Sequence, residues 1–125
     1  MTMPIERARA IRWVADLLEL LADDPDVAFH LRAQANNLRL THPTPGLLKA
    51  HLLDGTQAIP AVWVAALQAA GRLFAAMQHG RQGSSDTRHR LAMVLRHYPD
   101  SATAALMAGN RMNIREWLVY EDPDR

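Results

Sequence analysis

The sequence predicts an all-α protein, a compact bundle of six to seven helices in a single domain covering residues 1–125. Three observations predict this class. Apolar residues recur at helical spacing along the chain, and no segment has the alternating pattern of a β-strand. Prolines and glycines divide the chain into segments of helical length. A chain of 125 residues suits one hydrophobic core, and no linker long enough to separate two domains is visible.

Three helices are predicted in the first half. The first runs from residue 4 to about 22, because Pro4 suits the first helical position and Glu6 suits the positive end of the helix dipole. The acidic sequence at 23–26 contains a proline and ends this helix. A second helix is expected from about 27 to 40. A short third one starts at Thr44-Pro45, a good N-cap and first-turn pair, and stops at residues 54–55.

The second half has the same order of elements. Helices are predicted over residues 60–78, about 86–97 and about 101–108. A final helix is expected from Asn113, whose side chain suits an N-cap with Glu116 three positions later. The apolar stretch 58–77 is long enough for a bilayer, but it contains a proline, a glycine and Arg72. It is therefore interpreted as a helix surrounded by protein, and no membrane partner is expected.

The two halves share a frame that is displaced by 56 positions. Pro4 matches Pro60, and His42-Pro43 matches Tyr98-Pro99. This frame predicts two tandem three-helix repeats, residues 3–55 and 59–111, whose apolar faces pack against each other. The alternative stays open that two unrelated helical hairpins, each started by proline, align equally well.

The chain lacks the patterns that usually carry catalysis. It has no glycine-rich phosphate loop, no His-Glu-x-x-His and no Gly-x-Ser-x-Gly. Its six histidines include no pair three or four residues apart, and it has no cysteine, so neither a metal nor another cofactor is expected. The histidines are interpreted as surface and cap residues, and the acidic cluster at 16–26 as helix ends with a solvated loop. The N-terminus does not resemble a signal peptide, and a chain without cysteine is compatible with a reducing compartment, so we expect a cytoplasmic protein. Because the catalytic patterns are missing, we expect that it is not an enzyme.

The strongest candidate for a binding surface is the basic helix at 86–97. If Leu91 and Val94 face the core, the opposite arc of this helix is rich in cationic side chains. Thioethers adapt to varied surfaces and guanidinium groups grip carboxylates or phosphates, so this arc suits recognition. The predicted partner-binding residues are His89, Arg90, Met93, Arg96 and His97, together with Arg81 from the preceding loop. A plain solvated helix face remains the alternative.

Two short segments resemble a known family. The opening Met1-Thr2-Met3-Pro4-Ile5-Glu6-Arg7-Ala8-Arg9-Ala10, and separately Val94-Leu95-Arg96-His97-Tyr98-Pro99, are similar to the start and the end of short, uncharacterised proteobacterial proteins common in Burkholderia-like genomes. Members of that family resemble one helical hairpin about half as long as this chain. In this chain the opening occurs only in the first half and the Arg-His-Tyr-Pro ending only in the second. This implies either a tandem duplication in which one end of each copy has diverged, or a single unit that has received a long insertion. The resemblance implies a helical fold and a bacterial source, and no activity or site.

These observations favour a small non-enzymatic protein that binds another protein and blocks it, as immunity proteins, antitoxins and anti-defence inhibitors do. The alternative is a nucleic-acid-binding module that uses the basic helix 86–97, although a formal net charge of +1 argues mildly against it. A third hypothesis is a subunit of a larger assembly that docks through residues 117–120. The sequence leaves the oligomeric state open.

Overall fold

The structure is a computed structural model that describes residues 2–54, 59–107 and 118–119. Within these residues the chain forms six α-helices and no β-strand, which confirms the predicted fold class. The helices are α1 (Pro4–Asp23), α2 (Phe29–Leu38), α3 (Pro45–Asp54), α4 (Ala61–His79), α5 (Ser85–His97) and α6 (Ser101–Met107). The helix expected from Asn113 lies outside the described residues.

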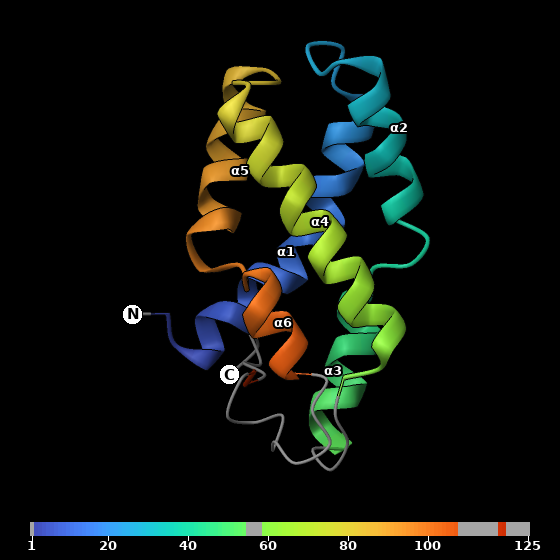
Figure 1. Cartoon of the computed structure of the whole chain (residues 1–125), viewed down its shortest axis with the longest axis vertical. Coiled ribbons are helices and arrows are strands. Elements are labelled where there is room, and N and C mark those ends of the chain that lie inside the picture. The colour runs from blue at the N-terminus through green and yellow to red at the C-terminus, as the bar shows by residue number, and fades with distance from the viewer. Residues whose placement is uncertain (1, 55–58, 108–117, 120–125) are drawn as a thin grey trace.

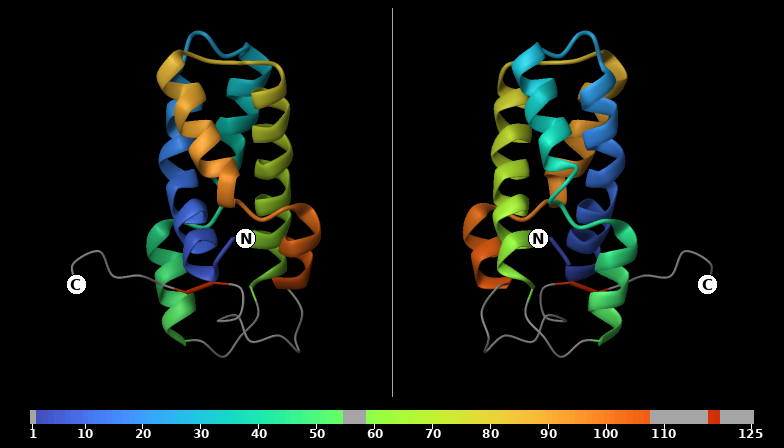
Figure 2. Two further views of the ribbon diagram at one scale, coloured as in Figure 1. Left: turned by 90° about the vertical axis from the view of Figure 1, so that its left-hand side faces the viewer. Right: turned by 90° about the vertical axis from the view of Figure 1, so that its right-hand side faces the viewer.

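The four helices α1, α2, α4 and α5 form a bundle, and the short helices α3 and α6 lie at one end of it (Figure 1, Figure 2). The main contacts join α1 to α2 and α5, and join α4 to the same two helices. The helices α1 and α4 therefore occupy opposite corners of the bundle. The helix α3 packs on α1, and α6 packs on α4.

The core consists of two clusters of buried side chains. One fills the centre of the bundle around Leu18 and Phe74, and the other lies at the end covered by α3 and α6, around Ile11 and Leu67. Tyr98 packs against both clusters. Burial of one large apolar side chain contributes about 1.5–3 kcal/mol, so these clusters supply the main stabilisation.

Corresponding helices of the two halves begin at displaced positions. Helix α2 starts at Phe29 and α5 at Ser85, while α3 starts at Pro45 and α6 at Ser101, which is 56 positions apart in both cases. The packing corresponds as well, because the α1–α5 contact has its counterpart in the α4–α2 contact. The origin of the two halves by duplication stays a prediction.

Helix α2 is shorter than the predicted 27–40. Val27 is buried and its backbone N–H donates to the Asp24 carbonyl, while the Ala28 N–H donates to the side chain of Gln82. These contacts hold residues 27 and 28 in a turn, so the helix begins only at Phe29. The predicted N-cap at Thr44 is confirmed, because its Oγ1 accepts a hydrogen bond from Leu47 N–H at 3.2 Å.

Helix α4, which contains most of the apolar stretch 58–77, buries one face in the core and exposes Val62 and Arg72. Among the described helices, none combines the length and apolar character needed to cross a membrane. Gly71 lies in the middle of α4, where an added Cβ would be 3.3 Å from the Tyr98 ring. The missing side chain therefore lets Tyr98 lie close against this helix.

Candidate functional site

Helices α1 and α5 run antiparallel along one side of the bundle (Figure 1, Figure 2). Side chains of both helices line a groove between them. Leu91 and Val94 of α5 are buried, as predicted from the sequence. The opposite arc of α5 exposes four of the six predicted binding residues, which are His89, Arg90, Met93 and Arg96. The amphipathic pattern of this helix therefore predicted its orientation correctly.

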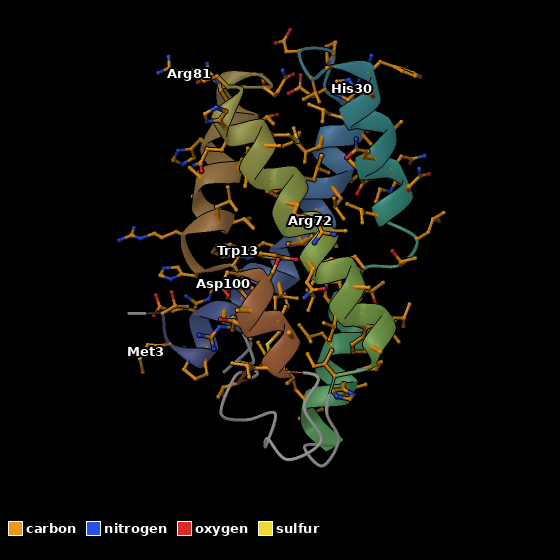
Figure 3. All side chains as sticks on the ribbon, viewed as in Figure 1. Met3, Trp13, His30, Arg72, Arg81 and Asp100 are labelled. Carbon is orange, nitrogen blue, oxygen red and sulfur yellow. The ribbon has the colours of Figure 1, made fainter. Side chains whose placement is uncertain are left out.

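Two hollows follow each other along this α1–α5 groove. The large hollow has a volume of about 430 Å³ and is lined by Trp13, Asp16, Leu17, Asp86, His89, Arg90, Met93 and Val94. The small hollow has a volume of about 190 Å³ and is lined by Glu6, Arg9, Ala10, Trp13, Met93, Arg96 and His97. Trp13 and Met93 line both hollows, so they stand side by side where the hollows meet. Trp13, labelled in Figure 3, is 41% exposed and Met93 is 44% exposed.

The charges of the large hollow are partly paired. Arg90 Nε lies 3.3 Å from Asp86 Oδ2, one helical turn earlier, and both side chains are exposed. An exposed pair at this spacing stabilises a helix by only about 0.3–0.5 kcal/mol, so a partner can compete for either group. Asp16 and Arg96 are exposed and form no ion pair with another described residue.

His97 differs from the sequence expectation of an exposed binding residue. The side chain is half-buried, with Nε2 2.9 Å from Glu6 Oε2 and Nδ1 3.3 Å from Thr2 Oγ1. These contacts connect the end of α5 to the start of α1. His97 lines the small hollow, but its ring already has protein partners on both nitrogens, so its main role is to hold the groove walls together.

Arg81 lies apart from the other predicted residues. It is exposed in the loop before α5, at the far end of the bundle, and lines neither hollow (Figure 3). Its backbone has φ of 51°, in the left-handed region. The structure thus brings together five of the six predicted residues and separates Arg81 from them.

Sequence reasoning missed Trp13 and Asp16, which form the α1 side of the large hollow. Trp13 lies outside the basic helix 86–97, so the pattern of that helix does not include it. A signal was present, since Trp13 and Asp16 are three positions apart and therefore share a face of α1. That face differs from the one that carries the buried Val14 and Leu18.

The expected solvated acidic loop is wrong for Asp24, which is only 5% exposed. Asp24 Oδ1 accepts from Asp26 N–H at 2.8 Å, while Oδ2 accepts from Ser84 N–H at 3.0 Å and from Thr87 Oγ1 at 2.5 Å. Burial opposes ionisation, but these hydrogen bonds outweigh it and lower the pKa of Asp24 to about 2. The carboxylate therefore ties the loop after α1 to the start of α5.

His42 is also buried, contrary to the expectation of surface and cap histidines. Its Nδ1 donates to the Pro43 carbonyl at 3.1 Å, and its Nε2 lies 3.4 Å from the Tyr98 hydroxyl, which donates to the Leu67 carbonyl at 2.8 Å. Burial lowers the pKa of His42 to about 4, although the Pro43 contact opposes this shift. Burial also raises the pKa of Tyr98. Both side chains are neutral near pH 7 and serve as packed polar groups.

A further hollow lies beside α2, where the ring of Phe29 is 76% exposed. The guanidinium carbon of Arg32 lies 5.6 Å from the centre of this ring, a cation–π distance. The walls of this hollow beside α2 also include Asp23 and Arg39. This hollow lacks the paired exposed Trp and Met of the α1–α5 groove.

In the described part of the chain, no three His, Asp or Glu side chains gather in a way that would hold a metal ion. Comparison of the chain with protein-family models, with curated proteins and with solved structures found no match. The functional argument therefore depends on the groove itself.

Proposed function

We propose that this protein is a non-enzymatic binding protein that docks another protein in the α1–α5 groove and blocks it. The observation that carries the proposal is the exposed pair Trp13 and Met93 at the centre of the groove, with charged side chains on both sides. The inferred class is that of immunity proteins, antitoxins and anti-defence inhibitors. The mechanism is steric occlusion of a surface on the partner.

The residue types of the groove support a protein partner. Aromatic residues, methionine and arginine are enriched at protein interfaces, and tryptophan and arginine often contribute most of the binding energy. Trp13 and Met93 lose water-exposed apolar surface when they are covered, and the flexible Met93 side chain can adapt to its partner. Arg90, Arg96 and Asp16 at the sides suit orientation of the partner, because charge complementarity mainly sets the association rate and the choice of partner.

The test is an affinity capture of the tagged protein from its native lysate, with and without nuclease, followed by mass spectrometry. We expect one protein in stoichiometric amount that survives nuclease treatment. The double variant Arg90→Glu with Arg96→Glu should lose this protein while keeping the thermal unfolding profile of the parent chain. Arg88→Glu is the matched control, because Arg88 is exposed on α5 outside both hollows. If the double variant captured as much of the partner protein as the parent chain, the basic face of α5 would not be the binding surface.

Nucleic-acid binding through α5 is the second candidate, favoured by the exposed guanidinium groups of Arg90 and Arg96. The carboxylates of Asp16, Asp86 and Glu6 in the same groove would repel phosphates. A nucleic-acid binder should give a heterogeneous captured set that disappears with nuclease. Its affinity should also fall with salt, with a log–log slope of about 0.9 per phosphate contacted in duplex DNA.

A further inference from the structure

We propose that the α1–α5 groove receives an amphipathic helix of the partner protein, with an apolar side chain between a cationic and an anionic one. This inference rests on the proposed function, because it names the segment of the partner that docks in the same groove. The charges at the two ends of the groove and the distance between them point to such a helix.

One end of the groove favours a cationic side chain. The large hollow has two carboxylates, those of Asp16 and Asp86. Asp86 is paired with Arg90 on the same helix, whereas Asp16 is exposed and forms no ion pair with another described residue. A cationic side chain of the partner would therefore find its best position beside Asp16.

The other end favours an anionic side chain. The small hollow has the guanidinium groups of Arg9 and Arg96 and the carboxylate of Glu6. Glu6 Oε2 already lies 2.9 Å from His97 Nε2. Arg96 is exposed and forms no ion pair with another described residue. A carboxylate of the partner can therefore form with Arg96 the bidentate contact that guanidinium geometry suits.

The distance between these two ends follows from helix geometry. Asp16 follows Trp13 by three positions, and Arg96 follows Met93 by three positions. Trp13 and Met93 meet where the two hollows join, and α1 and α5 run antiparallel (Figure 2). Asp16 and Arg96 therefore lie on opposite sides of this level, with their Cα atoms each about 4.5 Å from it along the helix axis. The matching charges of the partner should stand about 9 Å apart, with an apolar side chain between them.

A helix provides this spacing better than a strand. Side chains at positions i, i+4 and i+7 of a helix share one face and extend over about 10.5 Å along its axis. Three successive side chains on one face of a strand extend over about 13 Å. Recognition of an amphipathic helix in a groove uses anchors at the same helical positions. The central apolar side chain would cover Trp13 and Met93 and remove their exposed apolar surface from water.

Synthetic helical peptides test this geometry. The probe is an alanine- and glutamine-rich peptide of about 18 residues, because isolated helices shorter than about 12–15 residues are marginal in water. It carries Lys, Leu and Glu at positions i, i+4 and i+7. One comparison peptide has Glu at both charged positions, and another has Lys at both. A third keeps Lys, Leu and Glu but has a central proline, which breaks the helix.

Binding to the full chain is measured by two-dimensional NMR. The indole N–H signal of Trp13, assigned through Trp13→Phe, should shift on addition of the Lys-Leu-Glu peptide, while that of Trp63 on α4, outside both hollows, stays in place. The dissociation constants of the Glu-Leu-Glu and Lys-Leu-Lys peptides should be about threefold to tenfold higher, because each loses one favourable pair of exposed charges and brings like charges together. The proline peptide should bind more weakly than the helical Lys-Leu-Glu peptide.

Charge reversal in the protein should change the preferred peptide. Asp16→Arg places a cation at both ends of the groove, so this variant should prefer the Glu-Leu-Glu peptide, and Arg96→Asp should prefer the Lys-Leu-Lys peptide. Arg88→Asp is the matched control, because Arg88 is exposed on α5 outside both hollows, and it should keep the preference of the parent chain. All three side chains are exposed, so the variants should fold, and thermal unfolding checks this.

An unmoved Trp13 signal with the peptide in large excess would overturn the proposal. Equal binding of the three charge patterns, an unchanged preference in the reversed variants, or full binding of the proline peptide would overturn it as well. A chain that captures a protein from the lysate but fails these peptide tests would keep the proposed function and lose the helix. A switched peptide preference without any captured protein would count against the proposed function alone.

Discussion

Thr87→Val should destabilise the protein through Asp24, at the joint between the loop after α1 and the start of α5. Thr87 is fully buried, and its hydroxyl donates to Asp24 Oδ2 at 2.5 Å and accepts from Ser84 Oγ at 3.1 Å. Valine has nearly the same shape but removes the hydroxyl. The variant therefore leaves a buried carboxylate with two backbone donors, those of Asp26 and Ser84.

Two lines of reasoning give the magnitude. A hydrogen bond to a charged group contributes about 1.5–3 kcal/mol. The pKa of Asp24 is about 2, against an ordinary value of 3.8, and this difference corresponds to about 2 kcal/mol of stability near pH 7. The loss in Thr87→Val should thus be about 2 kcal/mol at pH 7. Because the pKa of the folded state is depressed, this stabilisation is complete above pH 3.8 and declines as the pH falls toward 2.

Urea unfolding followed by circular dichroism, repeated from pH 7 to acidic pH, measures both effects. The gap in unfolding free energy between the parent chain and Thr87→Val should narrow as the solution becomes more acidic. Thr41→Val is the control, because Thr41 is exposed and the change should stay within about 0.5 kcal/mol. A Thr87→Val protein as stable as the parent, or a gap that does not depend on pH, would refute the role given to Asp24.

Two further predictions concern the loop before α5 and the buried histidine. Gly83 has φ of +94°, and an added Cβ would lie 2.7 Å from Thr87 Cγ2. Gly83→Ala should therefore lower the free energy of unfolding by more than about 1 kcal/mol, which thermal unfolding measures. Gly46→Ala, in open space on α3, should be neutral or stabilising by comparison, and similar effects at both sites would contradict this account. The pKa of His42 is about 4 in the folded chain, against an ordinary value of 6.5. As the pH falls, the imidazole is therefore protonated in the unfolded chain before it is protonated in the folded one. The free energy of unfolding should fall by about 3 kcal/mol as the pH drops from 6.5 to 4. His42→Asn should flatten the pH dependence in this window, and an unchanged slope would show that another group titrates there.

One wall of the α1–α5 groove could be predicted from a local sequence pattern, and the other wall depends on tertiary structure. The period of α5 placed Leu91 and Val94 inward and Arg90 and Arg96 outward, because the direction of a side chain on a helix depends only on its position in the turn. No local pattern could say that α1, far away in the sequence, forms the other wall. Trp13 and Asp16 joined the site only through the packing of α1 against α5.

The two buried polar groups show the same limit. Asp24 and Thr87 are 63 positions apart, and His42 and Tyr98 are 56 positions apart. In the sequence Asp24 belongs to an acidic turn and His42 to a helix end, and both contexts are usually solvated. Their burial depends on which segments the packed helices bring together, the loop after α1 with the start of α5 for Asp24 and the segments after α2 and α5 for His42.

The sequence by itself determined the helices, their inward faces and most of their ends, because helical period, proline and capping residues act within a few positions of the chain. The tertiary structure alone decided which helices became neighbours. It therefore placed Trp13 and Met93 together at the centre of a charged groove, with Arg81 apart from it. It also made Asp24 a buried, ionised carboxylate whose hydrogen bonds connect the loop after α1 to the start of α5. The physical reason is that burial and pairing depend on the whole set of helices packing around one core, which no short segment encodes.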